Sequence, residues 1–282
     1  MQGGRCDGEG GLITGANTQG VPRTRPDGAY AAALVICAAL AIASAPWALA
    51  MPWLGVAFKP LATIVIIAFA RQRRAGRADV RRWVLVGLVL SLGGDIALLW
   101  PKDGFVPGLV SFLFAHLAYL LGFTRDRRFA AARLPFALYA LVAGGILALV
   151  WPGVPGALRL PVAIYVLCLA SMAAQAAVLW RTGVERAGVL ALGGALFVTS
   201  DALLATNRFA AAFPAASLWN LATYWLAQWC IASWLPAAGV RVGNNPADMG
   251  QAMVDGLEQR SPGDTNRCQP RTRHGRQHGG RS

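Results

Sequence analysis

The sequence has few charged residues, few histidines and none of the common motifs of metal or serine hydrolases. Only 14% of its 282 residues are charged, whereas soluble domains average about 25%. His116 is the only one of three histidines outside the C-terminal tail, and a catalytic zinc ion needs several His or Cys ligands. The five cysteines form no CxxC pair, and no GxSxG elbow surrounds Ser200. We therefore expect neither a metal site nor an organic cofactor, and a zinc-dependent membrane hydrolase is disfavoured.

Apolar residues, in contrast, make up 56% of the chain and come in eight long runs. A helix of about twenty apolar residues is long enough to span the hydrocarbon core of a bilayer. The first run is too long for the apolar part of a signal peptide, and seven more follow it. The sequence therefore predicts an all-α, polytopic membrane protein with eight transmembrane helices, at residues 30–50, 52–70, 83–100, 106–124, 134–151, 159–180, 188–206 and 216–238.

The two ends of the chain have a different composition from the apolar runs. Residues 1–28 are rich in Gly, Arg, Thr and Pro, and residues 239–282 in Gly, Gln and Arg. Such segments cannot bury enough apolar surface to fold alone. We expect both to be disordered tails on either side of one helical unit at residues 29–238.

The net charge of +13 is distributed unevenly. Of the 26 lysines and arginines, 22 lie in the two tails and in the loops at 71–82, 125–133 and 181–187. If the helices alternate in direction, all these segments lie on one side of the membrane. The positive-inside rule then predicts that both termini are cytoplasmic, in what we expect to be a bacterial inner membrane. Topology and contact with anionic membrane lipid explain these arginines better than nucleic-acid binding.

Two aspartates lie inside apolar runs, Asp95 in LSLGGDIALLW and Asp201 in LFVTSDALLAT. A carboxylate costs roughly 2.5–3.5 kcal/mol at the centre of an inserted helix. The alternating topology places both near the outer ends of their helices, about 7–8 Å below the boundary. If they face each other in an apolar pocket, a neutral acid beside a charged base can transfer protons at neutral pH. The alternative is a structural carboxylate that pairs with Lys59 or a tyrosine and fixes the helix packing.

Lys59 and His116 are further ionisable groups within the apolar runs. Pro60 follows Lys59 and favours a kink that would aim the amine inward. Lys59 would then be a counter-ion for a carboxylate or a phosphate, unless it reaches the outer interface instead. His116 is a candidate hydrogen-bond partner of an aspartate or of the substrate, and a structural buried histidine is equally compatible with the sequence.

Tyr165, Tyr224 and Gln228 are candidates to line a polar cavity. Tyr224 and Gln228 are four residues apart, so they share one face of a helix. The two tyrosines fall at a depth similar to that of the aspartates, and Gln228 lies nearer the midplane. Tyrosines near a bilayer boundary, however, often only anchor helices.

The spacing of the polar residues suggests an internal repeat. Asp95 and Asp201 are 106 residues apart, on the third and seventh runs. Two halves of four helices would share one orientation, related by an axis along the membrane normal. The other aligned pairs are Lys59 with Tyr165, Phe112 with Tyr224, and His116 with Gln228.

Six short motifs occur in order along these runs: KPLATIV, GGDIALL, FVPGLVSFLFAHLAYLLGF, YVLCLASM, GGALFVTSDALLA and TYWLAQWCI. Through them, residues 50–232 resemble the YhhN family of lysoplasmalogenases, integral membrane hydrolases that cleave the vinyl ether bond of lysoplasmalogens. The resemblance implies an eight-helix fold and an active site around the two aspartates. It also implies a lysophospholipid substrate, a fatty aldehyde product and a glycerophosphoethanolamine or glycerophosphocholine product.

Vinyl ether hydrolysis needs an acid and a base, because protonation of the β-carbon gives an oxocarbenium ion that water captures. We hypothesise that one of Asp95 and Asp201 protonates the alkene and that the other stabilises the cation and activates water. Lys59 would bind the phosphate or set the pKa values of the two aspartates. The residues that would orient water and the head group are His116, Tyr165, Tyr224 and Gln228.

Two other functions fit the same pattern. A proton- or ion-coupled transporter also uses paired repeats and buried aspartates. A receptor or scaffold would tolerate Asp→Asn changes at both positions.

Overall fold

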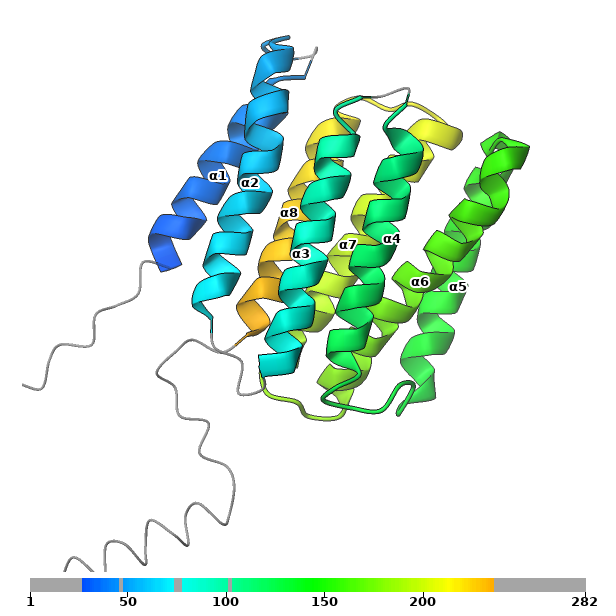
Figure 1. The fold of residues 1–282 in the computed structure, drawn as a ribbon. Coiled ribbons are helices and arrows are strands. Elements are labelled where there is room, and N and C mark those ends of the chain that lie inside the picture. Colours follow the sequence, from blue (N-terminus) through cyan, green and yellow to red (C-terminus); the bar gives the residue numbers. More distant parts are fainter. Residues whose placement is uncertain (1–26, 46–47, 74–77, 101–102, 236–282) are drawn as a thin grey trace, which may run out of the picture. The chain divides into compact units, whose positions relative to one another are not determined.

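The computed structural model describes residues 27–45, 48–73, 78–100 and 103–235. Within these ranges the chain forms eight α-helices, one short 3-10 helix and no strand. Neighbouring helices lie side by side and alternate in direction (Figure 1). The predicted disordered tails lie outside the described residues, except for Asp27 and Gly28. The elements are α1 (Asp27–Ala43), α2 (Pro52–Gln72), α3 (Ala78–Ala97), α4 (Phe105–Phe123), α5 (Arg133–Val150), η1 (Trp151–Gly153), α6 (Gly156–Arg181), α7 (Ala187–Phe209) and α8 (Ala216–Trp234).

The all-helical prediction is confirmed for this part of the chain, because each predicted run overlaps one helix. Five helices are long and apolar enough to cross a membrane, namely α2, α4, α5 together with η1, α6 and α7. Helix α1 is apolar but has only 17 residues. That all eight helices cross the membrane stays a prediction, and so does the internal repeat.

Helix α1 differs most from its predicted bounds. It begins at Asp27, inside the predicted tail, and ends at Ala43, well before residue 50. The hydroxyl of Ser44 donates to the carbonyl of Ala41 at 2.6 Å, and the next residue but one is a proline, which cannot continue a helix. Asp27 also forms an ion pair of 3.1 Å with Arg73 at the end of α2, so the start of α1 is attached to its neighbour.

Close packing of α3 on α4 depends on two glycines of α3. A Cβ atom at Gly94 would lie 2.5 Å from the ring of Phe112, and one at Gly87 would lie 2.3 Å from the ring of Tyr119. Only glycine therefore lets these two rings of α4 lie directly against the α3 backbone. The residue after Gly94 is Asp95, so this packing also fixes the surroundings of the first aspartate.

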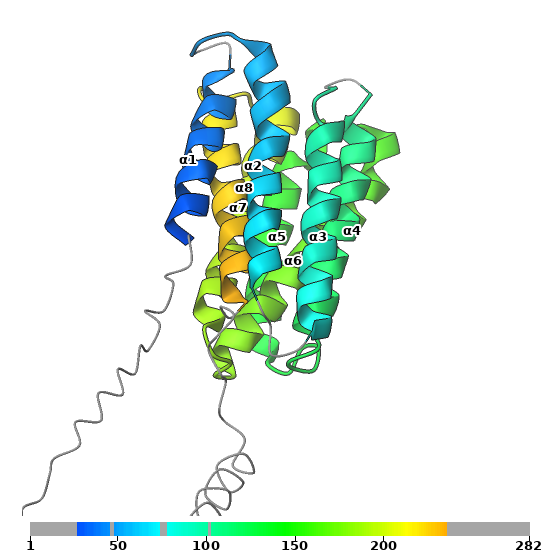
Figure 2. The same cartoon turned by 60° about the vertical axis from the view of Figure 1, so that its left-hand side comes forward.

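Helix α8 is the last of the described helices in the sequence, but it packs against the first helices of the chain as well as against α7. It packs along α7 and also contacts α1, α2 and α3, and Figure 2 shows it beside α1 and α2. Helix α6 in turn packs against α4, α5 and α7. As a result α2, α3, α6, α7 and α8, which carry most of the polar residues predicted for the site, surround a common interior.

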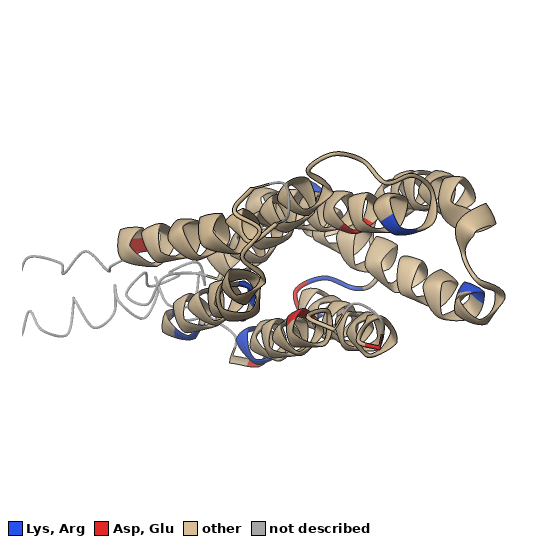
Figure 3. Cartoon of the chain, turned by 90° about the horizontal axis from the view of Figure 1, so that it is seen from above, with Lys and Arg blue, Asp and Glu red and all other residues tan. Residues whose placement is uncertain are grey.

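The basic residues gather at one end of the bundle. The C-terminal ends of α2, α4 and α6 lie at the same end as the start of α1 and the end of α8 (Figure 1). Viewed along the helices, most of the ribbon carries neither acidic nor basic residues (Figure 3). Which side of a membrane this end faces stays a prediction. The described arginines at this end are Arg71, Arg73, Arg81, Arg82, Arg125, Arg127, Arg128, Arg133, Arg181 and Arg186.

Candidate active site

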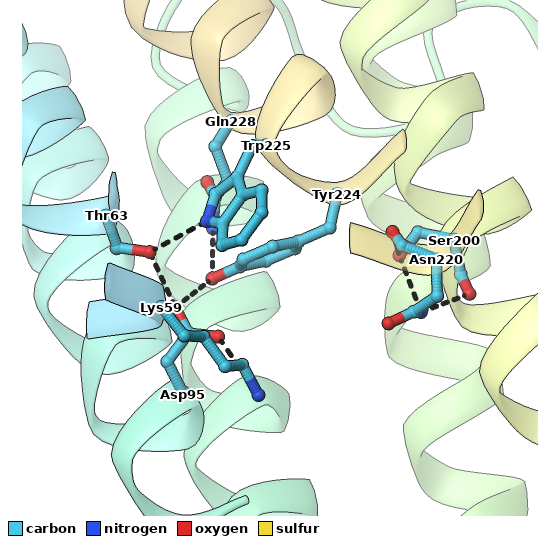
Figure 4. A network of polar contacts seen from close by, with 8 residues as sticks. All are labelled: Lys59, Thr63, Asp95, Ser200, Asn220, Tyr224, Trp225 and Gln228. Carbon is cyan, nitrogen blue, oxygen red and sulfur yellow. Dashed lines mark hydrogen bonds and ion pairs between the residues drawn. The ribbon is translucent and has the colours of Figure 1, made fainter. Parts of the chain in front are cut away.

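Asp95, near the C-terminal end of α3, has three polar partners from two other helices. The hydroxyls of Thr63 and Tyr224 donate to its Oδ2 atom at 2.6 and 2.8 Å. The ammonium of Lys59 lies 3.8 Å from its Oδ1 atom. Only 1% of the Asp95 side chain is exposed, and Figure 4 shows Tyr224 pointing from α8 towards it. Helices α2, α3 and α8 therefore meet at this carboxyl group.

The spacing of Lys59 and Thr63 on α2 explains why both reach Asp95. They are four residues apart, so they lie on the same face of the helix. The Lys59 side chain is only 15% exposed. A pair of charges so far from water interacts more strongly than a surface pair, and removing one partner leaves the other poorly solvated.

The partners of this carboxyl are themselves held by hydrogen bonds (Figure 4). The Nε2 of Gln228 donates to the hydroxyl oxygen of Tyr224 at 3.3 Å, and the hydroxyl of Tyr119 donates to the Oε1 of Gln228 at 2.6 Å. The indole Nε1 of Trp225 donates to the Thr63 hydroxyl at 3.4 Å. Each of these bonds is buried, so the network helps to hold the Thr63 and Tyr224 hydroxyls that donate to Asp95.

Asp201 on α7 has sparser surroundings. The hydroxyl of Tyr165 on α6 donates to its Oδ2 atom, and among the residues that the structure describes no lysine or arginine pairs with it. Its side chain is half-buried. The preceding residue, Ser200, is tied to α8, because Asn220 Nδ2 donates to the Ser200 carbonyl at 2.9 Å and Ser200 Oγ donates to the Asn220 carbonyl at 3.1 Å.

Both aspartates line one cavity, whose empty space, including the part open to solvent, is about 1060 Å³. The sequence hypothesis requires a shared pocket of this kind, and the catalytic roles of the two carboxyls stay a prediction. Its polar lining also includes Lys59, Tyr165 and Tyr224, whereas most of its other walls are apolar. The apolar lining residues include Phe105, Leu109, Phe112, Ala143, Ile146, Leu147, Val150, Val162, Val166, Leu169, Ala170 and Val198.

Two of the predicted site residues lie behind the cavity wall. Gln228 reaches the site only through Tyr224. His116 is fully buried, and neither of its ring nitrogens has a hydrogen-bond partner among the described residues. Its ring lies edge-on to those of Tyr165 and Phe197, with centroids 5.3 and 4.6 Å away. The described contacts thus do not include the predicted hydrogen bond between His116 and an aspartate.

Sequence reasoning missed several polar residues at the site, including Thr63, Asn220 and Arg208. Their spacing along the helices, relative to residues already selected, could have indicated them. Thr63 follows Lys59 by four residues, Asn220 precedes Tyr224 by four, and Arg208 follows Asp201 by seven. Each spacing places the missed residue on the same helix face as a residue already selected.

Among the described residues, no group of three or more His, Cys, Asp or Glu side chains could hold a metal ion. The site itself offers carboxyl and hydroxyl groups. One carboxyl lies beside an ammonium, the second has no cationic partner within the described ranges, and hydroxyls donate hydrogen bonds to both. Such a pair can donate a proton at one point of a bound molecule and accept one at another.

Comparison with known proteins assigns this helical region to a family. The sequence description of the YhhN family matches residues 54–235, which include every predicted site residue. The family resemblance inferred from the motifs is thereby confirmed.

Several named relatives are similar to this chain. Lysoplasmalogenase TMEM86B of Sus scrofa is 36% identical over 176 residues, which are 62% of this chain and 73% of the pig protein. Lysoplasmalogenase TMEM86B of Homo sapiens is 38% identical over 141 residues, 50% of this chain and 58% of the human protein. The lysoplasmalogenase of Mycobacterium bovis is 31% identical over 165 residues, 54% of this chain and 59% of its own. The chain thus spans less than two thirds of the human and mycobacterial relatives. No solved structure matches it.

Proposed function

Since the chain belongs to the YhhN family, we propose that it is an integral membrane hydrolase that cleaves the vinyl ether bond of lysoplasmalogens. The names of the similar proteins support this activity. The observation that carries the proposal is that two carboxyl groups from different helices line one largely apolar cavity. A lysolipid fits such a cavity, because its reacting bond needs proton transfer and its chain needs an apolar surface.

In the proposed mechanism, Asp201 is the proton donor. It has no cationic partner among the described residues, and a single hydroxyl, that of Tyr165, holds it. A carboxyl that is partly removed from water and has no paired cation is suited to carry a proton. Asp201 would transfer this proton to the β-carbon of the vinyl ether, and the alkene electron pair forms the new C–H bond. The α-carbon and the ether oxygen then share the positive charge of an oxocarbenium ion.

Asp95 would act as the anion and base. It faces the Lys59 ammonium and accepts two hydroxyl hydrogen bonds, which is the environment of a charged carboxylate. A negative charge fixed on the cavity wall stabilises the oxocarbenium ion. Asp95 would also take the proton from the water that attacks the α-carbon, so that a neutral hemiacetal forms.

Collapse of the hemiacetal returns both carboxyls to their starting states. The deprotonated Asp201 takes the hemiacetal hydroxyl proton, the C–O bond to glycerol breaks, and Asp95 gives its proton to the departing glycerol oxygen. One water is consumed, and the products are a fatty aldehyde and the glycerophospho-base. Tyr165 and Tyr224 would keep the two carboxyl groups in position through each transfer.

We further propose that all eight helices cross a bacterial inner membrane, with the basic end of the bundle on the cytoplasmic side. The cavity lies among the other halves of the helices, so it would open towards the outer leaflet. The apolar lining residues of α4, α5 and α6 would hold the alkenyl chain.

The direct test incubates purified protein in detergent with a lysoplasmalogen and measures free aldehyde. We expect aldehyde from the vinyl ether lipid and none from the saturated alkyl ether of the same chain length. A folded sample that releases no aldehyde from any vinyl ether lysolipid would refute the hydrolase. Proton-coupled solute uptake into sealed vesicles without a lipid product would favour the transporter instead.

A further inference from the structure

Arg208, in the last turn of α7, is the second basic residue that lines the cavity. Its guanidinium carbon lies 4.0 Å from the ring centroid of Phe105 on α4, and the residue is exposed. Lys59, the other basic residue, is occupied by Asp95 at 3.8 Å. In the described part of the chain no carboxylate pairs with Arg208. The cavity therefore presents one cation that is already neutralised and one that is available to a ligand.

The position of Arg208 relative to Asp201 is set by the geometry of α7. Arg208 follows Asp201 by seven residues, which is about two helical turns, so both lie on one face. The rise between them is about 10 Å, towards the end of the bundle that has few basic residues. A single helix face thus carries a proton donor inside the cavity and a cation nearer its outer end.

A lysoplasmalogen has its own charge at a matching distance from its reactive bond. Six bonds separate the vinyl ether α-carbon from the phosphorus atom, which is about 7 Å in an extended chain. The phosphodiester has one negative charge spread over two free oxygens, and the planar guanidinium donates to such a pair in a bidentate way. The side chain of Arg208 is long enough to cover the remaining distance.

We propose that Arg208 binds the phosphate of the lysophospholipid while the vinyl ether lies at Asp201. This inference rests on the proposed function and adds the site that distinguishes a phospholipid from a neutral alkenylglycerol. Contact with the Phe105 ring restrains the guanidinium, which lowers the entropy lost on binding. The head group then faces the end of the bundle where α7 ends, and the chain extends deeper, towards Ala143, Leu169 and Ala170. Lys59 is left as the partner of Asp95.

The test measures binding without hydrolysis. A saturated 1-alkyl lysophosphatidylcholine and a 1-alkylglycerol of the same chain length are the two probes. For Arg208→Gln we expect the lysophospholipid to bind about tenfold to a hundredfold more weakly and the alkylglycerol to bind as in the wild type. Arg208→Lys keeps the positive charge but loses the bidentate hydrogen bonding of the guanidinium, so it should retain part of the affinity for the phospholipid.

The matched control is Arg159→Gln. Arg159 lies at the same end of the bundle and over an aromatic ring, that of Trp151 at 5.4 Å, but it does not line the cavity. This variant should bind both probes as the wild type does. If it weakens lysophospholipid binding as much as Arg208→Gln does, the effect is one of general surface charge and the proposal is wrong.

Other outcomes would also overturn the phosphate site. An equal loss for both probes in Arg208→Gln would mean that only packing against Phe105 has changed. Inorganic phosphate that binds the wild type as tightly as the lysophospholipid would indicate an ion site and not a lipid site. Wild-type protein that binds the phospholipid selectively through Arg208 but releases no aldehyde would refute the hydrolase while leaving this site standing.

Discussion

The two aspartates occupy corresponding places in the helix order, yet their surroundings differ. Each has a polar partner 36 residues earlier on the preceding helix, Lys59 for Asp95 and Tyr165 for Asp201. Asp95 is nearly unexposed and has three partners, one of them a cation. Asp201 is half-buried, with one hydroxyl partner. In the proposed mechanism the two similar positions would thus begin the reaction differently, Asp95 as the anion and Asp201 as the proton donor, which is the asymmetry that acid and base catalysis needs.

The largest expected effect is on activity, and it should be shared by both positions. Asp201→Asn and Asp95→Asn should each lower aldehyde release by about 10²–10⁴-fold, because each removes a proton-transfer group. Asp79→Asn and Asp103→Asn, both at exposed aspartates, are the matched controls and should keep wild-type rates. Activity that survives either cavity substitution would show that the reaction does not use the pair as proposed.

The two Asp→Asn variants should differ in their free energy of unfolding, although both should lose activity. Asp95→Asn leaves the buried Lys59 ammonium without its carboxylate and should lower the free energy of unfolding by about 3–5 kcal/mol. Asp201→Asn removes no ion pair and should lower it by about 1 kcal/mol or less. Unfolding of the variants in detergent measures this difference.

A double variant tests the origin of that loss. Lys59→Met combined with Asp95→Asn removes both charges, so it should recover most of the lost stability while remaining inactive. Equal destabilisation by the two single Asp→Asn changes would refute the asymmetry between the sites.

The fold and the two aspartates could be predicted from the sequence because their signals are energetically large. An apolar run of about twenty residues has few alternatives to a membrane helix. A carboxyl within such a run costs enough to stand out. The bounds of α1 were less accurate, since an apolar composition continues past Ala43 where Ser44 and the following proline end the helix.

The partners of the aspartates were harder to predict. A threonine such as Thr63 costs little in an apolar helix, so nothing distinguishes it from a structural residue until Asp95 is seen beside it. Arg208 lies near a helix end, where a basic residue does not stand out from the charges of the loops. Spacing shows which residues share a helix face, but the rotation of one helix against another depends on packing, for example at Gly94 and Phe112.

A smaller effect should distinguish the two tyrosines. Tyr165→Phe removes the only hydrogen bond that the described residues make to Asp201 and should lower the rate about tenfold to a hundredfold. Tyr224→Phe removes one of three partners of Asp95, and the remaining two should limit the loss to about tenfold or less. Steady-state rates with both variants at saturating lipid make the comparison. A larger loss for Tyr224→Phe would mean that Asp95, and not Asp201, depends on a single partner.

The smallest effects concern Gln228 and His116, which the proposed repeat aligns. Gln228→Leu leaves the buried Tyr119 hydroxyl without its acceptor and should lower the free energy of unfolding by about 1–2 kcal/mol. His116→Leu removes two ring nitrogens that have no partner among the described residues, so it should change stability by less than about 1 kcal/mol.

Activity decides what His116 does. If its ring only supports Tyr165 from behind, His116→Leu should lower the rate a few-fold, because the neighbouring ring loses packing and not a proton-transfer group. A loss of about a hundredfold or more with unchanged unfolding would instead mean that the imidazole reaches the substrate once lipid is bound. In that case the Asp201 side of the cavity would have a second proton-transfer group. His116 would then differ in function from Gln228, whose amide is hydrogen-bonded to Tyr119 and Tyr224.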